Sequence, residues 1–237
     1  MSVSACVFAF DQAYERKYPL AAGGSFELAN VNGSVQVDGW ERDEVEIRAV
    51  KTADGDERDL DRVSIEVEAQ GNHVAVRTRY PRGGGVAVAV DYHVHVPYRV
   101  LLSSVATVNG SVSIRGVEGV GDVRSVNGNV EVTDSSGRFS AHATNGNIHL
   151  QLRRLFDGSP MLLETVNGSI VLGLPQDAQA ELRANSMNGD LYSELPVTAH
   201  GAYSQRGFHG TLGAGGGTIT ARTVNGGIRI LLEQPAI

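Results

Sequence analysis

Three polar residues in the first half of the chain are candidate ligands for a metal ion: Asp91, His93 and His95. They alternate with apolar residues, so their side chains would share one face of a β-strand. Two imidazoles and a carboxylate at this spacing can coordinate a divalent metal. An isolated His-x-His pair on a solvent-facing strand is more often ordinary surface. The sequence alone therefore predicts no metal and no other cofactor.

A second set of polar residues could support catalysis on a polysaccharide. Arg124, His142 and Glu164 occupy equivalent positions of a repeated pattern, and so do Glu131 and His149. Lyases built on parallel β-solenoids use carboxylates to hold a metal and a basic residue to abstract a proton. A column of alternating charge is explained more simply as a ladder that offsets repulsion between stacked strands. We therefore expect a non-catalytic protein, with a carbohydrate-active lyase or hydrolase as the alternative.

The single cysteine, Cys6, follows Val3-Ser4-Ala5, which resembles the cleavage box of bacterial lipoproteins. One cysteine excludes an intramolecular disulfide and a cysteine-rich zinc site. The apolar stretch 3–10 is short and has no basic region before it, so we expect no complete signal peptide in this sequence. We interpret residues 1–20 as an N-terminal extension that could retain part of an export signal, with Cys6 as the candidate lipidated residue.

The composition limits the classes of fold and partner. The chain has 237 residues with 29 glycines, few aromatic residues and a net charge of -7. Abundant glycine predicts frequent turns, and the mixed charge gives no reason to expect a nucleic-acid partner. No apolar run reaches the length of a transmembrane segment.

An Asn-Gly dipeptide recurs along the chain and is the main signal in the sequence. From the second copy onward the spacings are 18, 18, 22, 21 and 37 residues. The last gap suggests two repeats, with a degenerate corner at His209-Gly210. The copies are Asn32-Gly33, Asn109-Gly110, Asn127-Gly128, Asn145-Gly146, Asn167-Gly168, Asn188-Gly189 and Asn225-Gly226.

The repeat favours a stack of coils over a series of hairpins. Asn-Gly alone could form a two-residue hairpin turn. Here the same short strand follows the same dipeptide about every 20 residues, a period typical of a solenoid. We expect the corner glycines to have positive φ, and the asparagine side chains to bond to one another along the stack.

Alternation within each coil predicts which side chains face inward. Beyond each Gly the second and fourth residues are apolar in most coils, as in Val130 and Val132 or Ile170 and Leu172. A second inward row precedes each corner and in most coils ends in a Thr or Ser, whose hydroxyl could bond to corner backbone. The residues just before the asparagines, among them Val108 and Val166, could form an outward apolar stripe for interaction, although packing at the corners explains them more simply.

These patterns predict an all-β parallel β-solenoid, β-helix-like, with coils of about 20 residues. We assign residues 21–237 to a single domain: a broader, less regular β-sheet part at 21–105 and regular coils at 106–237. The first part should begin the same sheets and cap the stack.

The motifs resemble a bacterial family known as "putative adhesins", a domain of unknown function with a β-solenoid fold. The resemblance rests on the recurrent Thr-Val-Asn-Gly-Ser-Val, the opening 26–33 and Val94-His95-Val96-Pro97. It implies a protein that is extracytoplasmic or associated with the cell envelope, without assigned catalytic residues. An adhesin-like or structural module with an unknown envelope polymer or protein as its partner would fit this family.

Overall fold

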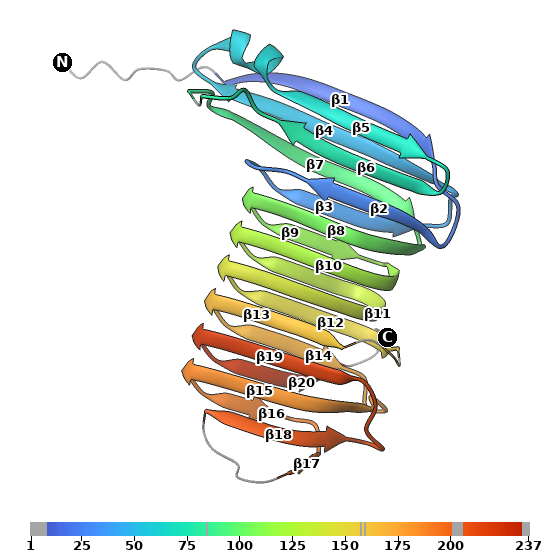
Figure 1. The fold of residues 1–237 in the computed structure, drawn as a ribbon, viewed down its shortest axis with the longest axis vertical. Coiled ribbons are helices and arrows are strands. Elements are labelled where there is room, and N and C mark those ends of the chain that lie inside the picture. Colours follow the sequence, from blue (N-terminus) through green and yellow to red (C-terminus); the bar gives the residue numbers. More distant parts are fainter. Residues whose placement is uncertain (1–8, 84, 157, 159, 201–205, 234–237) are drawn as a thin grey trace, which may run out of the picture.

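The computed structural model describes residues 9–83, 85–156, 158, 160–200 and 206–233. In these ranges the elements are β-strands and one 3-10 helix, η1 (Glu57–Arg62) (Figure 1). Within these ranges no helix has the length and apolar character needed to cross a membrane. Cys6, the candidate for lipidation, lies outside the described residues.

The strands form two ladders that face each other across the core and are joined through β11 (Val130–Asn145). The first ladder contains, in spatial order, β5 (Ser64–Gln70), β6 (His73–Arg79), β2 (Gly24–Ala29), β8 (Arg99–Asn109), β10 (Glu118–Asn127), the second half of β11, β13 (Met161–Asn167), β19 (Thr218–Asn225), β15 (Ala180–Asn188), β18 (Gly207–Leu212) and β17 (Val197–Ala199).

The second ladder lies on the opposite side of the core from the first. It contains β1 (Ala9–Pro19), β4 (Glu44–Asp54), β7 (Val88–Pro97), β3 (Val35–Trp40), β9 (Val112–Arg115), the first half of β11, β12 (Ile148–Leu155), β14 (Ile170–Leu174), β20 (Ile228–Leu232) and β16 (Leu191–Ser193).

Each coil places one strand in each ladder, and successive coils pair in parallel, as the sequence predicts. In the second ladder Val112, Val130, Ile148 and Ile170 lie in register. All four are fully buried, because strand alternation turns them toward the opposite ladder. The apolar rows from both ladders therefore meet in one continuous core, and the β-solenoid fold is confirmed.

The order of coils in space differs from their order along the chain. β19 and β20 lie between β13–β14 and β15–β16, so the last coil of the chain is inserted next to the end of the stack (Figure 1). The expected corner at His209-Gly210 is wrong. These residues lie inside β18, which pairs antiparallel with β15 and β17 and caps this end.

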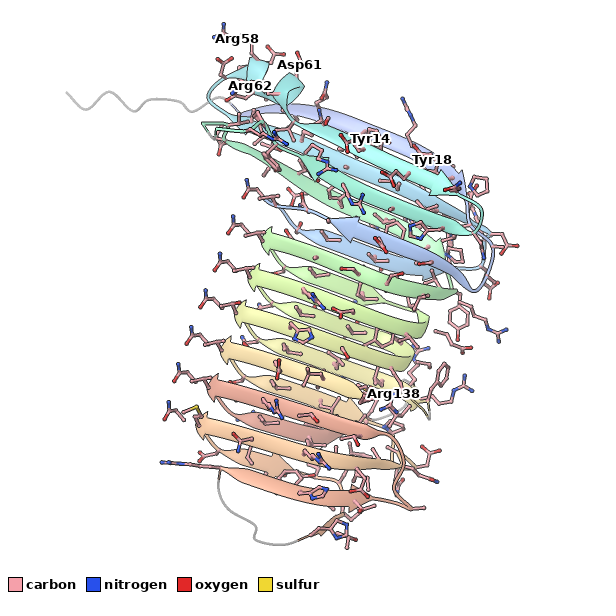
Figure 2. All side chains as sticks on the ribbon, in the orientation of Figure 1. Tyr14, Tyr18, Arg58, Asp61, Arg62 and Arg138 are labelled. Carbon is pink, nitrogen blue, oxygen red and sulfur yellow. The ribbon has the colours of Figure 1, made fainter. Side chains whose placement is uncertain are left out.

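The opposite end is capped in a similar way. The coil made by β2 and β3 stacks on β8 and β9 on one side and on β6 and β7 on the other. Residues 9–19, which the sequence suggested as part of an extension, instead form β1 and pair antiparallel with β4 along their whole length. Tyr14 and Tyr18 of β1 pack against the core at this capped end (Figure 2).

Candidate functional site

The corner glycines are required mainly by close packing between coils. A Cβ atom at Gly168 would lie 2.1 Å from the carbonyl oxygen of Gly146 in the preceding coil. The same distance separates a Cβ at Gly128 from the carbonyl oxygen of Gly110. The expectation of positive φ at every corner is wrong. It holds at Gly33, Gly110, Gly128 and Gly226, and not at Gly146, Gly168 or Gly189.

The corner asparagines form a hydrogen-bonded ladder along the stack. Each side-chain amide donates to the side-chain oxygen of the next corner asparagine at 2.8 to 2.9 Å. Figure 2 shows the side chains that project at these strand ends. The ladder order is Asn32, Asn109, Asn127, Asn145, Asn167, Asn225 and Asn188. This order agrees with the insertion of the last coil.

Buried hydroxyl groups support the corners from inside. Thr165 Oγ1 donates to the carbonyl oxygen of Gly146, and Ser125 Oγ donates to that of Gly110, each at 2.8 Å. Thr107, Thr223 and Ser186 make the equivalent bonds. The predicted role of this Thr/Ser row is confirmed. Together with the asparagine ladder, these bonds make the corner a rigid edge from which outward residues are displayed.

The candidate apolar stripe beside the asparagine ladder is exposed. Val108, Val126 and Val166 each expose about two-fifths of their surface, and Met187 exposes 58%. Thr144 interrupts the stripe in the coil between Val126 and Val166.

A shallow groove of about 1280 Å³ lies on the outer face of β12, β14, β20 and β16. A row of residues in register crosses it: His149, Val171, Arg229 and Tyr192. Tyr192 is 54% exposed and is the aromatic side chain of this surface. Backbone N–H groups of Asn147 and Ser169 at the groove edge bond to side chains of the preceding coils, so this surface is held in one conformation.

The column that most resembled a catalytic site is a charge ladder. His142 Nδ1 lies 3.7 Å from Glu164 Oε2, and Glu164 Oε1 lies 3.4 Å from an Arg222 nitrogen. Arg124 pairs with Asp122 of its own strand instead. Glu131 and His149 lie 3.8 Å apart in the other ladder. Each carboxylate lies on an open face beside a basic side chain, which is the arrangement of a stabilised surface.

The structure changes the membership of the predicted metal-binding group. His93 and His95 lie together on the outer face of β7, with ring centroids 4.6 Å apart. Asp91 accepts hydrogen bonds from the backbone and side chain of Ser34, away from that pair. The carboxylate beside the histidines is Asp38 of β3, whose Oδ2 lies 2.7 Å from His93 Nε2. Sequence spacing missed Asp38, because the parallel pairing of β3 with β7 brings it there.

Glu46 of β4 completes the surroundings of the two histidines. Its carboxylate is almost fully buried and contacts Lys17, Arg48 and His95. The hydrogen bond from Lys17 holds the pKa of Glu46 below its usual value, with Arg48 and His95 adding to the effect. Glu46 is therefore ionised at neutral pH.

Comparison with known proteins gives one family. A "putative cell adhesion protein" from Clostridium sporogenes is similar over 93% of this chain and 100% of its own, with a TM-score of 0.50 and 11% identity. Two further structures are more distant. A "putative adhesin" from Bacteroides fragilis is similar over 93% of this chain and 96% of its own, with a TM-score of 0.39 and 13% identity. A "putative lipid binding protein" from Parabacteroides distasonis is similar over 92% of this chain and 96% of its own, with a TM-score of 0.35 and 10% identity. No curated protein matches the sequence.

The first of these structures shares the solenoid architecture. The family model described as Toastrack DUF4097 matches residues 26–231, from the first coil to the last strand. The chain therefore belongs to the Toastrack DUF4097 family.

Proposed function

We propose that this protein is a non-catalytic binding module of the bacterial cell envelope, with an extended envelope polymer or protein as its ligand. The observation that carries the proposal is the groove over β12, β14, β20 and β16. It presents an exposed tyrosine, an arginine and a histidine within four stacked coils, on a sheet whose corners are fixed by hydrogen bonds. A rigid surface of this kind loses little conformational entropy when it binds a ligand.

The absence of focused chemistry on the groove supports binding over catalysis. An enzyme needs a nucleophile or base within hydrogen-bond reach of an orienting partner. The groove row instead changes from His149 to Val171, Arg229 and Tyr192, each from a different coil. The structural neighbours named as adhesins agree with a display surface, in which many weak contacts across several coils supply the affinity.

A binding screen tests this proposal. Purified protein is applied to a glycan array and to fractionated envelope polymers and proteins, alongside Tyr192→Ala. Tyr98→Ala is the matched control, because Tyr98 is a similarly exposed tyrosine outside the groove. We expect a ligand whose retention falls at least about tenfold in Tyr192→Ala, the equivalent of about 1.4 kcal/mol, and is unchanged in the control.

Turnover of a polysaccharide panel, with and without calcium, separates the binding module from an enzyme. His142→Ala and Glu164→Ala are the sharpest probes, since these residues form the most enzyme-like column. Cleavage that either substitution abolishes would refute the binding-module proposal.

A further inference from the structure

We infer that Asp38, His93 and His95 form a binding site for a divalent transition metal, with Zn²⁺ as the best-suited ion. One potential ligand atom from each residue lies within 4.8 Å of the others. Neither the proposed ligand groove nor the asparagine ladder includes these residues.

The backbone positions the three residues without help from a bound ion. His93 and His95 are two residues apart on β7, and their neighbours Tyr92, Val94 and Val96 are buried in the core. Core packing therefore fixes the face on which both imidazoles lie. Asp38 is the register partner of His95 in β3, yet its carboxylate bonds diagonally to His93. Gln36 Nε2 donates to the same Asp38 oxygen and holds the carboxylate in place.

Glu46 and Trp40 pack around His95 and limit its orientation. Its Nδ1 is buried, makes no hydrogen bond and lies 3.4 Å from Glu46 Oε2. Metal-binding histidines usually have a carboxylate beside the nitrogen that does not bind the metal, because a hydrogen bond to it fixes the tautomer. Glu46 lies where it could accept such a bond, although the bond is not made in this structure. Trp40 stacks on the His95 ring at 4.9 Å and is itself held by a bond from its Nε1 to the Glu44 carbonyl.

The charges around the site allow a cation to enter. Lys17, Arg48 and Arg115 are positive side chains around the site. Lys17 and Arg48 are engaged by Glu46, with Arg48 also contacting Glu15. Arg115, the register partner of Asp38 in β9, lies 3.9 Å from Asp134. The Asp38 carboxylate accepts a hydrogen bond from Gln36 and lies beside His93, and it supplies the negative charge of the site. His93 is 44% exposed, so one side of the site is open to solvent.

The donor set selects the class of metal. Two imidazoles with one carboxylate suit Zn²⁺, Ni²⁺, Cu²⁺ and Fe²⁺, whereas Ca²⁺ and Mg²⁺ require several oxygen ligands. Zinc bound by three protein ligands keeps its fourth position for water or for another ligand. The exposed side of His93 is where that fourth ligand would bind.

The test is zinc titration of the full chain, purified without a histidine tag, by calorimetry and by fluorescence of Trp40, the single tryptophan. We expect one equivalent of Zn²⁺ to bind with a saturating change in fluorescence. Co²⁺ in its place should give visible d–d absorption from nitrogen and oxygen ligands. His93→Ala, His95→Ala and Asp38→Asn should each weaken binding by at least about tenfold, and Glu46→Gln by roughly tenfold.

Matched variants separate this site from other histidines. His142→Ala and His149→Ala remove exposed histidines that each face one carboxylate, and both should bind zinc like the parent. His209→Ala probes a further His–Glu pair, with Glu181. Circular dichroism without metal checks that each variant is folded. The inference is overturned if no stoichiometric zinc binds, if binding persists in folded His93→Ala and His95→Ala, or if His209→Ala alone abolishes it.

Discussion

Single atoms at the corners decide how closely the coils can stack. A methyl group at Gly168 would meet the Gly146 carbonyl oxygen at 2.1 Å, and backbone cannot move away without shifting a whole coil. We expect Gly168→Ala to lower the free energy of unfolding by about 3 kcal/mol or more, as for overpacked cores. Gly55 has positive φ and open space around it, so Gly55→Ala should cost only about 1 kcal/mol. Urea melts of the two variants measure the difference, and equal costs would contradict the packing explanation.

One coil lacks the buried hydroxyl that supports its neighbours. Ala143 lies in register with Ser125 and Thr165, and it is buried. A serine there could donate to the Gly128 carbonyl oxygen as Ser125 does to that of Gly110. We expect Ala143→Ser to stabilise the protein by about 0.5–1 kcal/mol, and Thr165→Val to destabilise it by about 1 kcal/mol. Thermal melts test both, and a less stable Ala143→Ser would show that this site cannot hold the hydroxyl.

At the scale of elements, the asparagine ladder links the coils that carry an Asn-Gly corner. Asn145 donates to Asn127 and accepts from Asn167, whereas Asn188 is the end of the ladder and makes one such bond. Asn145→Ala should therefore lower the free energy of unfolding by about 1–2 kcal/mol, and Asn188→Ala by about half as much. Chemical denaturation of both variants measures this ratio. If Asn188→Ala lost more stability than Asn145→Ala, Asn188 would not be at the end of the ladder.

The sequence predicts well where the strands are, and poorly which strands pair with one another. The alternation of apolar and polar residues, as from Val112 to Ile114 or from Ile148 to Leu150, identifies the buried face of a strand. It does so because each coil must bury its own apolar side chains. The stacking order depends on which coil pairs with which. Coils that share the Thr-Val-Asn-Gly motif offer the same edge to one another. β13 and β19 carry this motif and β15 carries Ser-Met-Asn-Gly, but all three offer the same backbone edge. The motif therefore does not determine whether β19 or β15 pairs with β13.

The same limit explains the metal-binding candidates. The spacing of His93 and His95 is visible within one strand, and so was the apparent third ligand, Asp91. Asp38 is 55 residues from His93 and joins it only because the coil of β2 and β3 is inserted beside β7. Pairings between distant strands cannot be derived from periodicity, because they depend on the topology of the whole chain.

At the scale of the whole molecule, the inserted coil makes one end of the stack depend on its last strands. β15 pairs with β19 and β18, and no other described strand joins it to the body of the solenoid. We expect Ala221→Asp, a buried change in β19, to raise amide hydrogen exchange in both 180–199 and 218–232. Ala184→Asp in β15 is the matched control and should leave 218–232 protected. The stacking order would be wrong if 218–232 exchanged faster than 180–199 in the parent protein.

The inserted coil also has a kinetic consequence. Synthesis delivers β13 and β15 before β19 exists, and both end in an Asn-Gly corner. Until residue 218 appears, β15 can dock directly on β13, with Asn188 bonded to Asn167 in place of Asn225. Such an intermediate would satisfy the same hydrogen bonds and would have to open before β19 could enter. Refolding of the complete chain should therefore include a slow phase that is absent when residues 175–237 are removed. Only the complete chain can first pair β15 with β13 and then has to replace β15 by β19.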